Sequence, residues 1–459
     1  MERSIRVAFV FILSCFVLSC GSEDDENPQP GNNNPPNLKT ITIDPAVTFQ
    51  EMVGFGGALT WYSDRLISSA NKSKIAQLLF EDLGTDIVRF QSFYYPDNYP
   101  DYKGTANMSY DNSAMLFTRT GEIYNLMNGY DPDIKVLLSS WGPPASLKSN
   151  DNPREGTLKK DADGFMYDEF AQYWEDILDN MPFNPEYISI QNEPGYTNAG
   201  WTTCNWSGTE TATLPGYAAA FDKVHEKIKD RTNPPVMIGP ESPNTTSFSS
   251  FAEPLKDKAH LGMFAYHPYD FNSSVSPGLM NQQLKIIKGY NTKPNLMTEF
   301  SDNLSWINTA TFVNRTLTEA NSSGYIYWKM IWSTPTSGPD VAMVSINSGG
   351  NYVVTPYYYL FKHFAKDVDS GYKRIEAISQ VTDLSISGFI SPAADRITLV
   401  IINTGEQTKV GLELKNKDIK DIEVKRSTES SLYKVIDGVN PGDEITFPAQ
   451  SITTIVLNI

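Results

Sequence analysis

Short apolar runs alternate with longer amphipathic segments over much of the chain. Between residues 54 and 332, eight runs resemble strands, and most are continuously apolar, as expected of strands buried on both faces of a parallel sheet. Segments with helical spacing lie between several of them, such as 71–83, 167–181 and 214–230. Eight strand–helix units predict an eight-stranded α/β barrel. The predicted strands are 54–60, 85–90, 134–140, 186–191, 236–241, 262–267, 294–299 and 324–329.

The pattern changes after about residue 370, where runs of period two follow one another without helices. Gly, Asn, Asp or Pro separate these runs, which is typical of an antiparallel β-sandwich. An early strand at 39–44 could pair into the same sandwich. The predicted fold class is α/β: a (β/α)8 TIM barrel over 54–365, and a side β-sandwich built from 366–459 and the N-terminal strand region 38–53. The sandwich runs are 372–378, 383–390, 396–403, 408–414, 421–427 and 451–458.

The N-terminus has the pattern of an export signal. Two arginines precede an apolar run of about 13 residues, too short to span a bilayer, which ends before Cys20. This resembles a bacterial lipoprotein signal over 1–19 with lipidation at Cys20; Cys15 fits less well because apolar residues continue after it. Plain secretion with nearby cleavage is the alternative.

An acidic cluster at 23–26 follows Cys20 and resembles a cell-surface export signal of lipoproteins, or is simply an acidic linker. The stretch 27–37 is rich in Pro and Asn and lacks apolar residues, so 20–37 is expected to be a tether. We therefore expect a lipoprotein of the outer membrane or cell surface that contacts the membrane only through its lipid anchor.

Composition narrows the range of partners. The 459 residues carry a formal net charge of −17, which argues against nucleic acid and anionic membranes. Beyond the anchor at Cys20, Cys204 is the one cysteine, so an internal disulfide is excluded and a large core must supply stability. The four histidines lack metal-ligand spacing, so we expect no metal or other cofactor. We expect a monomer.

Candidate chemistry lies at the strand ends, because active sites of such barrels form at the carboxyl ends of the strands. The fourth predicted strand leads into Gln191-Asn192-Glu193-Pro194, and the seventh ends in Thr298-Glu299. Paired carboxyl groups, one protonated and one ionised, are the apparatus of glycoside hydrolysis. A glutamate at a strand end can also be a solvated loop charge or part of a structural ion pair. His267 ends the sixth strand, either as a structural histidine or as a hydrogen-bond partner of the nucleophile or substrate.

The segments GFGGA (54–58), Ile190–Pro194 and Met297-Thr298-Glu299 resemble glycoside hydrolase family 30. The resemblance covers about 39–459 and implies a (β/α)8 barrel with a side β-sandwich, a retaining mechanism and no cofactor. It implies that Glu193 is the general acid/base, that Glu299 is the nucleophile and that Asn192 binds the sugar 2-hydroxyl. A matching arginine, here Arg89, would lie beneath the carboxylates and favour their ionised form, unless it makes only a surface pair.

Aromatic residues indicate a sugar-binding cleft. Indole rings cover the flat C–H faces of sugars with a large apolar area. Trp141 and Trp328, the latter expected within the eighth strand, are our leading candidates, and Tyr196 could line the leaving-group side. Trp174 lies in an amphipathic segment and is expected in the core. The remaining tryptophans follow predicted strands and either line the cleft or pack the loops: Trp61, Trp201, Trp206, Trp306 and Trp332.

Within the family, the segments 139–150 and 191–206 look most like the xylanase branch. An arginine that reads glucuronate side chains in that branch is missing from 329–334. The leading interpretation is an endo-β-1,4-xylanase acting on polysaccharide or oligosaccharide. A β-1,6-glucanase, a β-1,6-galactanase or another β-glycosidase of the family is the alternative, and a non-catalytic glycan-binding surface lipoprotein is a different class. Loops 91–133 and 197–214 decide between endo and exo action.

Overall fold

The computed structural model describes residues 39–97, 113–272, 274–301 and 304–459. The predicted signal sequence, the lipidation site at Cys20 and the tether 20–37 lie outside these residues. In the described part of the chain, every helix is too short or too polar to span a bilayer.

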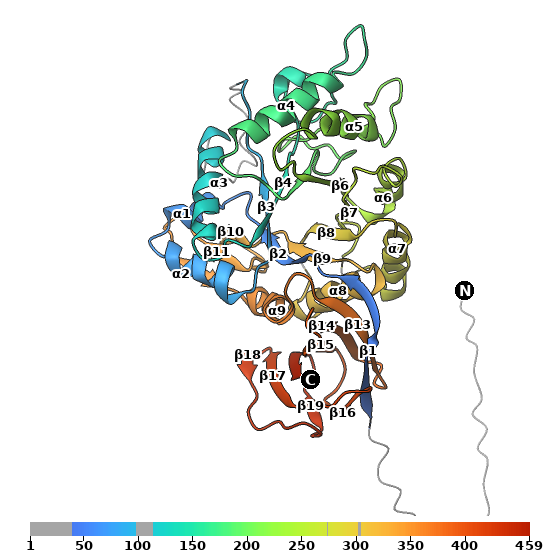
Figure 1. The fold of residues 1–459 in the computed structure, drawn as a ribbon. Helices are drawn as coiled ribbons and strands as arrows, with labels where there is room; N and C mark the ends of the chain where they lie inside the picture. Colours follow the sequence, from blue (N-terminus) through green and yellow to red (C-terminus); the bar gives the residue numbers. More distant parts are fainter. Residues whose placement is uncertain (1–38, 98–112, 273, 302–303) are drawn as a thin grey trace, which may run out of the picture. The chain divides into compact units, whose positions relative to one another are not determined.

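Eight parallel strands form a closed barrel in which spatial order follows sequence order from β2 to β9 (Figure 1). The strands are nearly all buried, which explains their continuous apolar sequences. Strand β5 is short because the chain leaves the ladder at Ile190, so the segment that carries Glu193 turns over the barrel mouth instead of extending the strand. The barrel strands are β2 (Gly54–Ala58), β3 (Ile87–Gln91), β4 (Lys135–Ser139), β5 (Tyr187–Ser189), β6 (Val236–Ser242), β7 (Met263–Tyr266), β8 (Asn295–Phe300) and β9 (Gly324–Tyr327).

Helices follow the strands and pack around the barrel (Figure 1). Local sequence fixes several helix starts. Asn244 caps the helix after β6 by accepting a hydrogen bond from the Ser247 amide at 2.8 Å, and Ser276 caps the next helix, which has proline at its first position. The helices are α1 (Asp64–Ser68), α2 (Lys72–Gln77), α3 (Ser113–Asn128), α4 (Tyr167–Asn180), α5 (Tyr217–Ile228), α6 (Thr245–Ala252), α7 (Pro277–Gly289), α8 (Trp306–Glu319) and α9 (Pro356–Ala365), with a π-helical turn at Leu78–Asp82 and a 3-10 turn at Ala145–Leu147.

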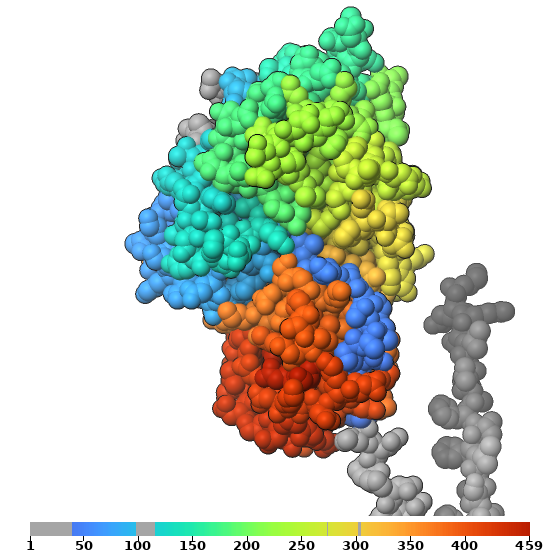
Figure 2. Space-filling view, viewed as in Figure 1, coloured from blue at the N-terminus to red at the C-terminus, as the bar shows by residue number. Residues whose placement is uncertain are grey.

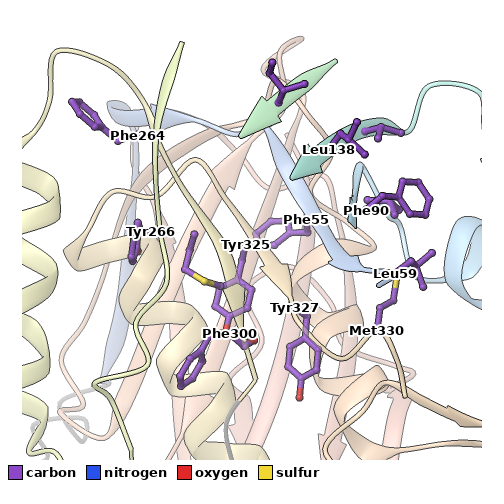
Figure 3. Packing of buried hydrophobic residues seen from close by; sticks show 14 of the residues in the cluster. Phe55, Leu59, Phe90, Leu138, Phe264, Tyr266, Phe300, Tyr325, Tyr327 and Met330 are labelled. Carbon is purple, nitrogen blue, oxygen red and sulfur yellow. Dashed lines mark hydrogen bonds between the residues drawn. The ribbon is translucent and has the colours of Figure 1, made fainter. Parts of the chain in front are cut away.

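The main core lies between the barrel and its helices. Figure 3 shows members of this core that project from the barrel strands, among them Phe55, Phe90 and Phe300. Phe300 of β8 meets Phe312 of α8 with ring centroids 4.6 Å apart, and each such buried ring stabilises the fold by about 1.5–3 kcal/mol. A second cluster fills the barrel interior, and Trp141 and Trp328 belong to it.

A nine-stranded sheet lies beside the barrel and curls around its own apolar core. Strand β1 from the chain's beginning lies inside it, antiparallel to β13 and parallel to β16. Figure 2 shows these early residues in blue against the orange and red residues of the C-terminal region. The strands are β1 (Thr40–Glu51), β13 (Lys373–Ser379), β14 (Leu384–Ile390), β15 (Arg396–Asn403), β16 (Thr408–Leu414), β17 (Asp421–Thr428), β18 (Ser431–Val435), β19 (Ile445–Phe447) and β20 (Ser451–Asn458).

Helix α9 joins the barrel to this sheet. The buried His363 ring makes hydrogen bonds of 2.8 Å to the hydroxyls of both Thr454 and Ser427, which lie on β20 and β17. The predicted fold class, a (β/α)8 barrel with a side β-sandwich that includes an early strand, is confirmed.

Two details differ from the expectations. Trp328 lies directly after β9 and not within the strand, because the chain bends there to carry the indole ring over the barrel mouth. A small three-stranded sheet also follows the eighth barrel strand and was not predicted, because its strands have only three residues each and lack a readable period. It comprises β10 (Ile331–Ser333), β11 (Val344–Ile346) and β12 (Tyr352–Val354).

Candidate active site

Two glutamates predicted from the sequence meet at the carboxyl end of the barrel. Glu193 follows β5 and Glu299 is the penultimate residue of β8. A carboxylate oxygen of each lies within 4.8 Å of the other. Glu193 has a backbone φ of 49°, a conformation that costs a non-glycine residue about 1–3 kcal/mol and that clusters at functional sites. The Glu193 amide donates to the Glu241 carbonyl at 3.1 Å, which helps to hold this turn.

Arg89 of β3 lies fully buried beneath the carboxylates and donates to four surrounding side chains, the first of which is Ser139 Oγ, 3.1 Å from Nε. Its Nη1 donates to Glu299 Oε2 at 2.6 Å. Its Nη2 donates to Asn192 Oδ1 at 2.6 Å and to Glu241 Oε2 at 3.0 Å. Although burial opposes the charge, the carboxylates of Glu241 and Glu299 raise the pKa of Arg89. Arg89 is therefore a fixed cation under Glu299, as the resemblance implied.

His267 lies directly after β7 and is also fully buried. Its Nδ1 is 3.1 Å from Glu193 Oε1, and its Nε2 is 3.9 Å from Glu241 Oε1. Although burial opposes it, the charge of Glu299, the hydrogen bond with Glu193 and the nearby carboxylate of Glu241 raise the pKa of His267 to about 9. The ring is thus cationic at neutral pH and donates from Nδ1 to Glu193. The predicted roles were a structural histidine or a hydrogen-bond partner of the nucleophile or substrate, whereas the observed partner is Glu193, the other glutamate of the pair.

The carboxyl groups occupy different electrostatic environments. Burial and the nearby charge of Glu299 raise the pKa of Glu193, although the hydrogen bond from His267 opposes the shift. Glu299 instead accepts hydrogen bonds from Arg89 and, at 2.8 Å, from the Tyr269 hydroxyl. A carboxyl group that holds its proton beside one that is held by two donors is the arrangement that an acid/base and a nucleophile require.

Glu241, near the end of β6, is the one acidic member of the cluster that the sequence reasoning missed. It is fully buried between Arg89 and His267, with a backbone φ of 55°. Although burial alone would raise it, the charges of Arg89 and His267 lower the pKa of Glu241 to about 2. Glu241 therefore supplies a permanent negative charge. Tyr269 was missed as well; it lies two residues after His267 in a segment without a strand pattern.

An aromatic cleft of about 440 Å³ lies above the two glutamates. Trp141 and Trp328 stack with ring centroids 5.9 Å apart, and the Arg89 guanidinium lies 4.6 Å from the Trp141 ring. Tyr196 and Asn192, which were predicted to bind substrate, line the same cleft. The lining residues are Trp61, Trp141, Asn192, Glu193, Tyr196, Trp201, Pro243, Asn244, Tyr269, Asp270, Glu299 and Trp328.

Other tryptophans lie elsewhere. Trp174 is buried in the main core as expected, and Trp206 is buried there too, so it packs the loop instead of lining the cleft. Trp306 begins α8 and packs against the same core.

Among the described residues, Glu193, His267 and Glu299 are close enough to share a metal ion, with ligand atoms within 4.8 Å of one another. A metal would need the neutral imidazole. The raised pKa of His267 and its hydrogen bond to Glu193 favour the protonated ring, so these three residues fit acid–base chemistry better than metal binding.

Comparisons with known proteins agree with this fold. No protein-family model matches the sequence. The endo-1,6-β-D-glucanase neg1 of Aspergillus fumigatus is 25% identical over 402 residues, which cover 75% of this chain and 76% of that protein. A family 30 subfamily 8 xylanase from Clostridium acetobutylicum superposes with a TM-score of 0.69 at 19% identity, covering 92% of this chain and all of that one. A solved endo-β-1,6-glucanase superposes with a TM-score of 0.68 at 18% identity, over 93% and 96% of the two chains.

The barrel and the side sheet form the same fold as these two solved glycoside hydrolases. The particular fold is that of the family 30 xylanase, so the fold that the sequence resemblance implied is confirmed.

Proposed function

We propose that this protein is a retaining glycoside hydrolase that cleaves a β-linked glycan, with Glu193 as general acid/base and Glu299 as nucleophile. One observation carries the proposal: the two carboxyl groups face one cleft with oxygens within 4.8 Å of each other, in opposite electrostatic environments. Retaining enzymes place these groups about 5–5.5 Å apart, and inverting enzymes about 6.5–9.5 Å apart.

The reaction has two steps. Glu299 attacks the anomeric carbon while Glu193 protonates the departing glycosidic oxygen, so a carbon–oxygen bond to the enzyme replaces the one to the leaving group. Water then attacks the same carbon, Glu193 takes its proton, and Glu299 leaves as a carboxylate. Arg89 and Tyr269 hold Glu299 in place in both steps. Asn192 directs its Oδ1 to Arg89, which leaves its amide N–H groups to donate to a sugar 2-hydroxyl.

The first candidate substrate is xylan. The segments 139–150 and 191–206, which resemble the xylanase branch, supply Trp141, Asn192 and Tyr196 to the cleft. Residues 329–334 offer no arginine for a uronate, so a neutral or lightly decorated chain is preferred. The second candidate is a β-1,6-glucan, because neg1 is named an endo-1,6-β-D-glucanase.

A panel of polysaccharides tests both candidates: linear xylan, glucuronoxylan, arabinoxylan, β-1,6-glucan and β-1,6-galactan, with product analysis. Hydrolysis of a xylan supports the first candidate, and hydrolysis confined to β-1,6-glucan supports the second. Binding without hydrolysis of any member would instead support a glycan-binding lipoprotein.

Substitutions at the two glutamates test the mechanism. Glu299→Ala and Glu193→Ala should each lower kcat at least a thousandfold, and azide should rescue Glu193→Ala on an activated aryl glycoside as a β-glycosyl azide. Either variant retaining near wild-type turnover, or an azide product of inverted configuration, would contradict the assignment.

We also propose that the protein is anchored by a lipid at Cys20 on the outer membrane or cell surface. The apolar run, the cysteine and the acidic cluster that follows support this. Radiolabelled palmitate should enter the wild-type chain and not the Cys20→Ser variant; equal labelling would refute the anchor site.

A further inference from the structure

The helix that follows β6 begins at the edge of the aromatic cleft. Asn244, the residue before α6, lines the cleft together with Glu193 and Glu299. Asp270, which lies after β7, lines it as well. Both side chains are polar, and sugar hydroxyls both donate and accept hydrogen bonds. The contacts of the two side chains with the first turn of α6 decide which of them has an atom left for a sugar.

Asp270 is occupied by the helix. Its Oδ1 accepts from the Thr245 amide at 3.1 Å. Its Oδ2 accepts from the Thr246 amide at 3.1 Å, and from the hydroxyls of Thr245 and Thr246 at 2.7 and 2.9 Å. A carboxylate has about four lone-pair sites, so these four hydrogen bonds satisfy it. Asp270 therefore fixes the first turn of α6 and is not left to bind substrate.

Asn244 keeps a donor. Its Oδ1 accepts from the Ser247 amide at 2.8 Å. Because that amide can only donate, the side-chain atom that faces it must be the oxygen, which fixes the orientation of the Asn244 amide. Among the described residues, none accepts a hydrogen bond from Asn244 Nδ2. Nδ2 is therefore the polar atom of this side chain that remains for a ligand in the cleft.

Asn192 has the same arrangement. Its Oδ1 accepts from Arg89 at 2.6 Å, so its amide N–H groups are the ones left for a ligand. The segments that carry the two asparagines are joined by the hydrogen bond of 3.1 Å from the Glu193 amide to the Glu241 carbonyl. Two amides whose oxygens are held by the protein offer donors alone, and such donors select the oxygen atoms of a sugar.

We propose that Asn244 is a substrate-binding residue whose Nδ2 donates a hydrogen bond to a hydroxyl oxygen of the bound glycan. The inference rests on the proposed function and adds a second asparagine to the sugar contact implied for Asn192. The donor is held in place before substrate arrives, because Asp270 and Ser247 fix the turn, so little conformational freedom is lost on binding. A neutral hydrogen bond of this kind contributes about two- to tenfold to affinity.

Asn244→Ser tests the inference, because serine caps a helix about as well as asparagine does but is too short to carry an amide into the cleft. Isothermal titration calorimetry compares Glu299→Ala with the double variant Glu299→Ala, Asn244→Ser. The ligands are xylohexaose and the β-1,6-linked glucohexaose and galactohexaose. The second substitution should weaken binding about two- to tenfold and leave the unfolding midpoint unchanged. Equal affinities of the two proteins would overturn the inference.

Two control variants separate contact from capping. Asn291→Ser makes the same change in an exposed turn after α7 and should leave affinity unchanged. Ser276→Ala removes the cap of α7 outside the cleft lining, so it should lower the unfolding midpoint and leave affinity unchanged. A loss of affinity in Ser276→Ala equal to that in Asn244→Ser would show that helix capping sets the affinity, and would overturn the inference.

The wild-type enzyme separates this inference from the proposed function. Hydrolysis of one of the three hexasaccharides, together with equal affinities with and without Asn244→Ser, would refute the inference alone. Binding that Asn244→Ser weakens, without hydrolysis by the wild type, would refute the proposed function alone. Neither binding nor hydrolysis of any of these glycans would refute both.

Discussion

Glu241 is the residue whose replacement tests the electrostatics of the site most directly. It lies fully buried between two cations. Its Oε2 accepts a hydrogen bond from Arg89 Nη2 at 3.0 Å, and its Oε1 lies 3.0 Å from Arg89 Nε as part of the ion pair. Glu241→Gln keeps the shape of the side chain and removes its charge. Arg89 then keeps its ion pair with Glu299, and His267 keeps its hydrogen bond with Glu193.

The magnitude follows from these contacts. Removing one partner of a buried ion pair costs about 3–5 kcal/mol, because the other charge stays buried and uncompensated. Glu299 still pairs with Arg89 at 2.6 Å, so we expect a loss at the lower end of this range. The free energy of unfolding should fall by about 3 kcal/mol. A second effect falls on Glu193. A site that is more positive favours the ionised carboxylate, so the pKa of Glu193 should fall from its raised value.

Denaturant unfolding and the pH dependence of kcat/KM measure the two effects. The alkaline limb reports the acid/base, which must be protonated to release the leaving group, so Glu241→Gln should move that limb to lower pH. Glu226→Gln, which breaks an exposed pair with Lys229, is the matched control and should leave both measurements unchanged. A Glu241→Gln enzyme with an unshifted alkaline limb and a loss below 1 kcal/mol would refute the reasoning.

Three further predictions concern single contacts. Tyr269→Phe removes the 2.8 Å donor to Glu299 and should lower kcat/KM on aryl glycosides about 10–100-fold without moving the unfolding midpoint; an unchanged rate would refute this role. Burial and the charges of Lys425 and Lys362 lower the pKa of His363 to about 3. As the pH falls, this histidine is therefore protonated in the unfolded state before it is protonated in the folded state. The free energy of unfolding should decrease as the pH drops from about 6.5 towards 3. His363→Gln should flatten that part of the stability–pH curve, and an equal slope in both proteins would count against it. Lys148→Ala leaves the buried carbonyl of Thr203 and the partly buried carbonyl of Glu155 without their donor. It should cost about 1–3 kcal/mol and hasten proteolysis of these loops, whereas equal cleavage rates would refute the link.

The barrel could be predicted because its strands are buried on both faces and are therefore continuously apolar. The small sheet β10–β12 could not, since three-residue strands carry no period. The local sequence pattern also could not predict which strands pair with β1. Ile41 pairs with both Ser379 and Leu412, which are over 300 residues away. Such pairing depends on where the rest of the chain has folded.

The site was partly predictable for a similar reason. Glu193 and Glu299 stand at strand ends in specific motifs, so the rule for barrel active sites found them. Glu241 also stands near a strand end, in the segment GPES, and the same rule applied to every strand would have included it. Its charge balance with Arg89 and His267, and the Trp61–Trp201 contact, depend on distances between loops that no local pattern contains.

Strand β1 makes the barrel and the side sheet inseparable by a single cut. A fragment that stops after α9 would keep β1 without its two partners and would expose the face of α9 that holds His363 against β20 and β17. The complementary fragment would lack an interior strand, so β13 and β16 would become open edges prone to aggregation. Exchange of the side sheet between relatives therefore has to transfer two segments, one from before the barrel and one from after it, as a matched pair.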